Sequence, residues 1–348
     1  MIISSLWQAI GNTPLLHLPL RDGDVHLYIK LEQLNPCGSM KDRMALSMLN
    51  DLEFRHELAP GAKIVESSSG NTASALAMLC AARGYEFTAL MDNHSSKSKR
   101  LAVSAVGGKV RVIASDGGGL VTALRDEEAE RLSAQQDTYW TEQHNNPANS
   151  WGYEALAKEL MDDLGTDIDY FVTAIGTGGS LCGTASCLKQ NIPGLIAIGV
   201  EPEGSVIFGP PGHNYLQSGT GTPDTATVGL VIDYDVIDLG KKVSDRHAFA
   251  TCRVLATRLG ILVGGSAGGA IYEALKIAAS AVKGSNIVTI ACDAGSKYTD
   301  TIFDDEWLSK QGINLSAEVA EVQNLLSSRN WRHNDIRQTR IGSPSLKV

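Results

Sequence analysis

Short apolar runs alternate along most of the chain with longer runs of helical spacing. Several stretches have the length and apolar pattern of β-strands, namely residues 25–32, 63–67, 86–91, 109–114, 138–143, 169–175, 197–200 and 286–292. Between them, apolar residues recur at helical spacing in residues 42–58, 73–82, 97–106, 120–132, 153–164 and 247–258. This alternation predicts an α/β fold in which mostly parallel, twisted sheets are flanked by helices on both faces.

Two segments depart from this pattern. Residues 203–235 are rich in Gly, Pro, Thr and Asp and predict a long loop, which at that length is more often functional than decorative. Residues 314–348 are expected to form a C-terminal tail, with one short amphipathic helix at 317–326 followed by polar and basic sequence.

Composition narrows the class of protein. The chain has 348 residues, 43% hydrophobic and 20% charged, as in soluble globular proteins of about two domains or subdomains. The net charge of −9 argues against nucleic-acid binding. Six cysteines show no metal-ligand spacing, so we expect reduced thiols, no metal and a cytoplasmic location. No signal peptide is recognisable at the start, and no apolar run is long enough to span a membrane.

Lys41 is the first candidate for chemistry. It follows a break made by Pro36 and Gly38 and comes just before the helical run 42–58, so it is expected at a helix N-terminus. The helix dipole there disfavours an ammonium, and a neutral amine is what an imine-forming lysine needs. The alternative is a surface lysine in the first turn of a helix.

A glycine-rich turn, Gly176-Thr177-Gly178-Gly179-Ser180, connects a predicted strand to a predicted helix. Its backbone N–H groups and the helix dipole are suited to a phosphate. It is neither a Walker loop nor a clean dinucleotide fingerprint. The alternative is an ordinary turn, because glycine-rich turns between strands and helices are common.

A serine-rich turn, Glu66-Ser67-Ser68-Ser69-Gly70-Asn71-Thr72, stands at another end of a predicted strand. Its hydroxyls and free N–H groups are suited to a carboxylate. The alternative is a helix cap, although a cap needs one such residue rather than several in a row.

Two further residues are expected at strand ends. Ser266 lies in a glycine-rich turn after a predicted strand at 261–263, and Gln143 ends the predicted strand 138–143. His144, beside it, is not a candidate. Because the carboxyl ends of parallel strands form a common crevice, we expect all these turns to meet. An imine-forming lysine, a phosphate site and a carboxylate site together indicate pyridoxal phosphate (PLP) and an amino acid.

Five motifs occur in the order typical of one family. They are Asn-Pro-x-Gly-Ser-x-Lys-Asp-Arg, Ser-Gly-Asn-Thr, Gln-x-x-Asn-Pro-Ala-Asn, Gly-Thr-Gly-Gly-Ser and Gly-Gly-Ser-Ala-Gly. The sequence resembles the cysteine synthase/cystathionine β-synthase family, the fold-type II PLP enzymes, over residues 5–312. The resemblance implies a larger cofactor-binding subdomain, 1–40 and 150–313, and a smaller mobile subdomain, 41–149, that carries the carboxylate-binding loop.

The resemblance also implies roles for individual residues. Lys41 would hold the cofactor as an imine and act as the base at Cα, and Asn71 would bond the ring oxygen. Gly176, Thr177, Gly178, Gly179 and Ser180 would hold the cofactor phosphate. Ser266 would face the pyridine nitrogen. Ser68, Ser69, Thr72 and Gln143 would hold the substrate carboxylate.

The implied reaction is PLP-dependent β-replacement on O-acetyl- or O-phospho-L-serine through an aminoacrylate. The nucleophile would be sulfide, giving L-cysteine, or an amine such as that of glutamate, giving a 2,3-diaminopropionate precursor. Ser67, Met40 and residues 204–209 are similar to the siderophore-pathway synthases that use glutamate. The resemblance further implies a cytoplasmic homodimer acting on small amino acids. Alternatives are a cystathionine β-synthase or a serine/threonine dehydratase of the same fold, and a non-catalytic ligand-binding protein.

Overall fold

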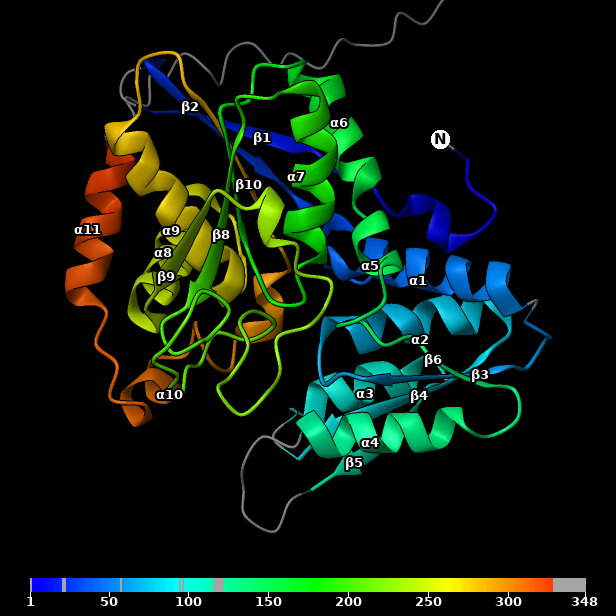
Figure 1. Ribbon diagram of the computed structural model, residues 1–348. Coiled ribbons are helices and arrows are strands. Elements are labelled where there is room, and N and C mark those ends of the chain that lie inside the picture. The colour runs from blue at the N-terminus through cyan, green and yellow to red at the C-terminus, as the bar shows by residue number, and fades with distance from the viewer. Residues whose placement is uncertain are drawn as a thin grey trace, which may run out of the picture.

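The computed structural model describes residues 2–20, 23–56, 58–93, 95, 97–114 and 122–327. In this part of the chain, the strands form two separate sheets (Figure 1). The strands are β1 (Leu15–Leu20), β2 (Val25–Lys30), β3 (Lys63–Ser67), β4 (Glu86–Asp92), β5 (Lys109–Ile113), β6 (Thr138–Trp140), β7 (Tyr170–Ala174), β8 (Ile196–Pro202), β9 (Leu239–Val243) and β10 (Asn286–Ile290).

The helices alternate with these strands over most of the chain. They are α1 (Lys41–His56), α2 (Asn71–Arg83), α3 (Lys97–Ala105), α4 (Thr122–Ser133), α5 (Ala148–Trp151), α6 (Glu154–Leu164), α7 (Gly179–Asn191), α8 (Asp245–Leu259), α9 (Gly265–Ser280), α10 (Asp305–Lys310) and α11 (Ser316–Ser327).

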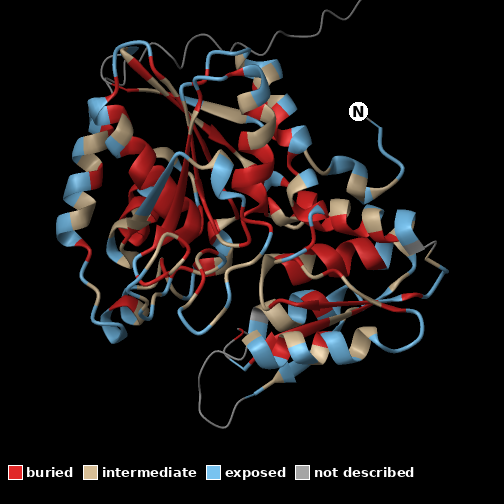
Figure 2. Ribbon diagram, viewed as in Figure 1, coloured by how far each residue is buried: buried red, intermediate tan, exposed pale blue. Residues whose placement is uncertain are grey.

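The larger sheet has the strand order β1-β2-β10-β7-β8-β9. Only β1 is antiparallel to its neighbour; the other pairs in this sheet are parallel. Helix α9 packs directly on β7, β8 and β10, while α6 and α7 pack against each other on the other side of the sheet (Figure 1). The central strands are buried on both faces (Figure 2), which explains their nearly continuous apolar sequences.

The smaller sheet has the order β5-β4-β3-β6, and every pairing in it is parallel. Helix α2 packs on β4 and β3, with α1 outside it, and α4 packs on β3, β4 and β6 from the opposite face (Figure 1). The alanine-rich sequence of α2 is buried between the sheet and α1, where small side chains permit close packing. The α/β class with mostly parallel sheets covered by helices is therefore confirmed.

Sequence patterns predicted most elements to within a few residues and failed at short ones. The strand expected at 261–263 is wrong, because only Val263 forms an isolated bridge, to Ala294, in the short connection between α8 and α9. Strand β1 was not predicted because His17 and Pro19 interrupt its apolar pattern. Proline is tolerated there because β1 is an edge strand.

The two irregular segments are attached to the larger sheet. The loop 203–235 contains no α-helix or β-strand, and the neighbouring Thr220 and Gly221 both donate to the carbonyl of Ile175 at 2.7 Å. Helix α11 packs on α8 and buries Val322 and Leu326. The rest of the expected tail, 328–348, lies outside the described residues. None of the helices described is long and apolar enough to cross a bilayer.

Candidate active site

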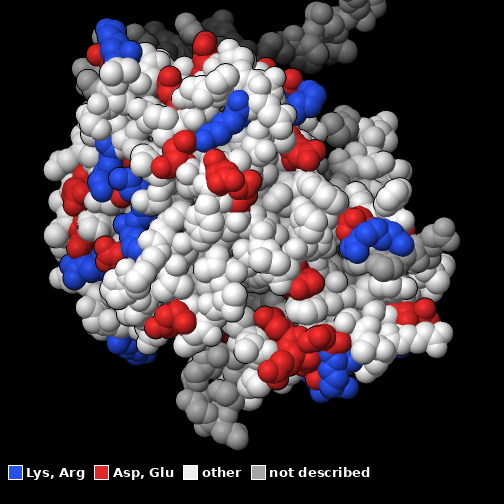
Figure 3. Space-filling view, in the orientation of Figure 1, with Lys and Arg blue, Asp and Glu red and all other residues white. Residues whose placement is uncertain are grey.

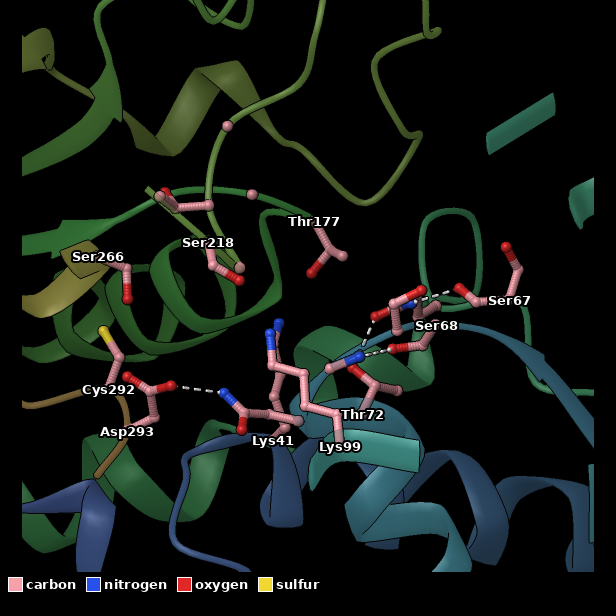
Figure 4. A pocket seen from close by; sticks show the side chains of 18 of the residues that line it. Lys41, Ser67, Ser68, Thr72, Lys99, Thr177, Ser218, Ser266, Cys292 and Asp293 are labelled. Atoms are coloured by element: carbon pink, nitrogen blue, oxygen red, sulfur yellow. Dashed lines mark hydrogen bonds between the residues drawn. The ribbon is translucent and has the colours of Figure 1, made fainter. Parts of the chain in front are cut away.

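The turns that follow β3, β7 and β10 border one cavity of about 370 Å³. The starts of α1 and α9 reach the same cavity through Lys41 and Ser266. Figure 4 shows Lys41 between two groups of side chains, with Ser266 and Asp293 on one side and Thr72 on the other. The expected meeting of strand ends at a common crevice is therefore what the structure contains.

Lys41 is the first residue of α1, and it is half-buried in the wall of the cavity. No described residue forms a hydrogen bond or an ion pair with Lys41 Nζ. Burial lowers the pKa of Lys41 to about 8, although neighbouring groups, Cys292 first among them, act in the opposite direction. A lysine with this pKa is neutral in about one molecule in ten at pH 7, far more than a free lysine, and an imine-forming amine must be neutral.

The two residues after Lys41 fix the start of α1. Asp42 Oδ2 accepts a hydrogen bond of 2.6 Å from the backbone N–H of Cys37. The buried guanidinium of Arg43 donates to the carboxylates of Glu32 and Glu159 at 2.8 Å. Because Glu32 follows β2 and Glu159 lies on α6, these bonds tie the helix that carries Lys41 to the larger sheet.

The glycine-rich turn places backbone rather than side chains at the cavity. Gly178 precedes α7 with φ of 94°, and no side chain caps this helix. The first N–H groups of α7 are therefore left for an anion. Gly176 and Thr177 border the cavity, whereas Gly179 and Ser180 are buried in the first turn of the helix.

The serine-rich turn carries its polar groups on side chains. Ser69 Oγ donates to Asp92 Oδ2 at 2.7 Å and accepts from Arg125 Nη1 at 2.9 Å. Helix α2 begins directly after Gly70 without a side-chain cap, so its first N–H groups are also left for an anion. Ser68, Ser69, Asn71 and Thr72 border the cavity.

Gln143 borders the cavity and is bonded to this turn. Its Oε1 accepts from Thr72 Oγ1 at 2.9 Å, and its Nε2 donates to the carbonyl of Ser67 at 3.1 Å. The backbone N–H of Gln143 donates to Glu66 at 3.3 Å. Burial raises the pKa of Glu66 to about 7, against the effect of its hydrogen bonds. Glu66 thus acts behind the turn and orients Gln143.

Asn71 is held by residues of the larger sheet. Its Nδ2 donates to Asp293 Oδ2 at 2.8 Å, and its Oδ1 accepts from Lys297 Nζ at 2.6 Å. Asp293 also accepts from the hydroxyl of Tyr298 at 2.6 Å. A donor on one side and an acceptor on the other fix which way the amide of Asn71 faces.

Ser266 lies in the first turn of α9 and is hydrogen-bonded with Cys292. Burial raises the pKa of the Cys292 thiol to about 12, so this thiol stays protonated at neutral pH. The end of the cavity at Ser266 therefore presents two uncharged groups.

The sequence did not nominate several residues that border this cavity. They are Asp92, the last residue of β4, Lys99 on α3, Arg125 on α4, and Asp293, which follows β10. His144, which was set aside, borders it too, and burial lowers its pKa to about 4. The positions of Asp92 and Asp293 at strand ends were a usable signal. Lys99 and Arg125 lie on helices, and nothing in the sequence pattern around them pointed to the cavity.

A family model described as pyridoxal-phosphate dependent enzyme matches residues 6–293. The chain belongs to this family. The expected cofactor is thereby confirmed as PLP, and the protein is an enzyme. The five motifs that resemble those of cysteine synthases all lie within the matched region.

Relatives within the family support the cysteine synthase-like group. A cysteine synthase-like protein of Sinorhizobium fredii is 42% identical over 94% of this chain and 98% of its own length. An N-(2-amino-2-carboxyethyl)-L-glutamate synthase of Ralstonia nicotianae is 36% identical over 89% of this chain and 92% of its own length. The solved structure of an O-acetylserine dependent cystathionine β-synthase from Helicobacter pylori has a TM-score of 0.80 and 32% identity, over 86% of this chain and 98% of that one.

The residues present fit a bound PLP. An uncapped helix start behind Gly178 suits its phosphate, and Lys41 offers a buried amine without a partner among the described residues. One carboxylate oxygen of Asp293 is also buried without a hydrogen bond in this part of the structure. Polar groups left in this state are costly in a folded protein, and a polar cofactor in the cavity would satisfy them.

Proposed function

We propose that the protein catalyses β-replacement on an O-activated L-serine, either O-acetyl-L-serine or O-phospho-L-serine. The observation that carries this proposal is the position of Lys41. Its buried amine lies in one cavity with two uncapped helix starts, one after the glycine-rich turn and one after the serine-rich turn. Two anion sites around one reactive amine suit a phosphorylated cofactor and the carboxylate of an amino acid.

The roles of the site residues are part of the proposal. Bound PLP supplies an electron sink for the carbanion at Cα. Lys41 holds the cofactor and then carries the Cα proton, and Asn71 bonds the ring oxygen. The cofactor phosphate is held by Gly176, Thr177, Gly178, Gly179 and Ser180. The substrate carboxylate is held by Ser68, Ser69, Thr72 and Gln143.

Ser266 favours β-replacement over other reactions of the cofactor. As a hydroxyl, it is a neutral partner for the pyridine nitrogen, and the adjacent Cys292 is a neutral thiol. With a hydroxyl rather than a carboxylate as the partner of the ring nitrogen, a protonated ring is not favoured and the electron sink is weak. Loss of a good leaving group from Cβ relieves the charge at once, which supports elimination followed by addition.

The nucleophile is either sulfide or an amine. A cysteine synthase-like relative supports sulfide, and a relative named N-(2-amino-2-carboxyethyl)-L-glutamate synthase supports the amine of glutamate. A cystathionine β-synthase activity is the second candidate, because a solved relative carries that name together with O-acetylserine as its donor.

Residues 41–149 are proposed to move as a unit toward residues 1–40 and 150–313 when the substrate binds. The separation of the strands into two sheets supports this division. Closure would exclude water from the reacting centre. We further propose that the enzyme is a cytoplasmic homodimer, which light scattering of the purified protein would test.

One experiment tests the proposed reaction. The holoenzyme is mixed with O-acetyl-L-serine or O-phospho-L-serine, and acetate or phosphate release is measured together with the visible spectrum. We expect release of one equivalent per site without a nucleophile and turnover when sulfide or glutamate is added. Lys41→Ala should abolish release, while Lys158→Ala on the surface of α6 should not. Release that survives Lys41→Ala would contradict the proposal.

A further inference from the structure

A second cavity, of about 350 Å³, adjoins the cavity that holds Lys41. The two share Arg125, His144 and Gly221 as lining residues. The remaining wall comes mainly from the start of α4 and from residues 222–229 of the long loop. A molecule in the second cavity would therefore have direct access to the first one at Arg125 and His144.

Arg125 stands at the junction with unused hydrogen-bonding capacity. Its side chain is 11% exposed. Its Nη1 donates to Ser69 Oγ at 2.9 Å and to Asp92 Oδ2 at 3.4 Å, and its Nη2 donates to Thr122 Oγ1 at 3.3 Å. Its Nε is buried without a partner among the described residues. A guanidinium has five N–H donors in a fixed planar fork, so a carboxylate could be bound after a small adjustment of the side chain.

The charges around Arg125 favour a small zwitterionic ligand over a simple anion. Acidic side chains gather on the surface near α4 (Figure 3), and the sequence of this helix contains Asp126, Glu127, Glu128 and Glu130. Of these, Asp126 also borders the second cavity. An inward arginine and an acidic neighbour together would attract a ligand that carries both a carboxylate and an amine.

The volume argues in the same direction. Sulfide has a single heavy atom and needs about the space of one water, ~30 Å³. A cavity of about 350 Å³ is instead within the range of sites for small organic ligands. Hydroxyl groups of Thr222 and Thr225 on its wall offer further hydrogen bonds to a polar ligand.

We propose that the second cavity binds the nucleophile, that this nucleophile is an amine carrying a carboxylate, and that Arg125 binds the carboxylate. The inference rests on the proposed β-replacement. The amine loses one proton to solvent and its nitrogen forms a bond to Cβ. The C–O bond to acetate or phosphate has then been broken, and the leaving group has kept the electron pair. The proton that Lys41 took from Cα returns to Cα. With O-acetyl-L-serine, one proton is therefore released to solvent per turnover. With O-phospho-L-serine, the leaving phosphate takes up that proton and departs as HPO4²⁻.

L-glutamate and sulfide serve as the two probes of this site. Arg125→Gln should raise the KM for glutamate about 30-fold, as expected for loss of a charge-assisted hydrogen bond. With sulfide as the nucleophile, only the KM of the serine donor should change, because it depends on the contact of Arg125 with Ser69. Arg131→Gln is the matched control, because Arg131 lies on the same helix, pairs with Glu128 and borders neither cavity. The Arg131 variant should change neither the KM for glutamate nor the reaction with sulfide.

Arg125 also contacts Ser69, so a second variant separates its two contacts. Ala226 borders only the second cavity, and Ala226→Trp should fill that space without touching Ser69. We expect the rate of reaction with glutamate to fall at least about tenfold. Acetate release from O-acetyl-L-serine, which needs no nucleophile, should remain normal.

The failures of the two proposals are distinguishable. If no donor releases acetate or phosphate, the β-replacement itself is wrong. If release is normal and sulfide is consumed but wild-type protein never uses glutamate, the inference is overturned while the reaction stands. If Arg125→Gln slows phosphate release from O-phospho-L-serine but not acetate release from O-acetyl-L-serine, Arg125 binds the leaving group. That result also overturns the inference.

Discussion

The two turns proposed to bind anions in the active site are built in opposite ways. Both join a parallel strand to a helix, and both leave the helix start without a side-chain cap. In the glycine-rich turn of the larger sheet, the backbone itself is the binding surface and close packing fixes its shape. In the serine-rich turn of the smaller sheet, side chains form the surface and hydrogen bonds between them fix it.

The glycine-rich turn is tightly packed from behind. A Cβ at Gly179 would overlap Asn149 Oδ1, and a Cβ at Gly178 would lie 2.6 Å from Ile232. Asn149 in turn donates to Thr177 Oγ1 at 2.9 Å. The turn therefore has little freedom to move, which suits a cofactor that stays bound through every turnover.

The serine-rich turn is adjustable by comparison. Nothing lies within 4 Å of a Cβ placed at Gly70. Ser69 forms hydrogen bonds with Asp92, at the end of β4, and with Arg125, on α4. Helix α4 packs on the same smaller sheet to which β4 belongs. Polar contacts of this kind can exchange partners, which suits a substrate that enters and leaves. The difference supports the proposal that the rigid turn holds the cofactor and the adjustable turn holds the substrate.

The largest expected effect is at Gly179. Gly179→Ala should weaken PLP binding about 100-fold and lower the free energy of unfolding by about 1–3 kcal/mol, because the methyl group has no space. Cofactor titration and denaturant unfolding would measure the two effects. Gly194→Ala is the control, since a Cβ there meets nothing within 4 Å. Equal behaviour of both variants would refute the description of this turn as rigid.

Lys41 lies between the two turns, and its protonation gives the next effect. Only the neutral amine can react with the cofactor aldehyde, and burial lowers the pKa of Lys41 to about 8. Incorporation of PLP into the apoprotein should therefore accelerate about tenfold per pH unit up to about pH 8 and then level off. Asp293→Asn should move this midpoint down, because the carboxylate of Asp293 raises the lysine pKa. A midpoint near that of a free lysine would mean that the amine is hydrated.

Ser69 tests the adjustable turn. Ser69→Ala removes the hydroxyl shared by Asp92 and Arg125, so we expect the KM of the serine donor to rise about tenfold. The visible spectrum of bound PLP should not change, since the rigid turn is untouched. Ser74→Ala, one turn further along α2, should have no effect on either measurement. Loss of PLP from the Ser69 variant would show that the two turns are not independent.

The sequence predicted one part of this site better than the other. Strand ends followed by glycine or serine are visible locally, so Lys41, Gly176 and Ser69 could be placed in a common crevice before the fold was known. The partners of these residues could not. Arg125 comes from a helix that packs on the smaller sheet, and only that packing brings it to Ser69. Asp293 lies at a strand end of the larger sheet, which was a usable signal, but its contact with Asn71 arises only where the two sheets meet.

The smallest expected effect concerns the link between the two regions. Asn71 opens α2 in the smaller part of the molecule, yet its amide is oriented by Asp293 and Lys297 of the larger part. Lys297→Met removes the donor to Asn71 Oδ1 and leaves the acceptor Asp293 in place. Because one of the two contacts remains and water can replace the other, we expect PLP affinity to fall only about threefold.

A double-mutant cycle separates orientation of Asn71 from other effects of Lys297. Lys297 also donates to the carbonyl of Cys37 at 2.9 Å, so Lys297→Met could act through the approach to Lys41 instead. If Lys297 acts through Asn71, Lys297→Met should cause no further loss of PLP affinity in a protein that already carries Asn71→Ala. The effects of the two substitutions on PLP affinity will then not be additive. Additive losses would place the effect at Cys37. In that case Lys297 would support the segment before Lys41 through the carbonyl of Cys37. The amide of Asn71 would then be oriented by Asp293 alone.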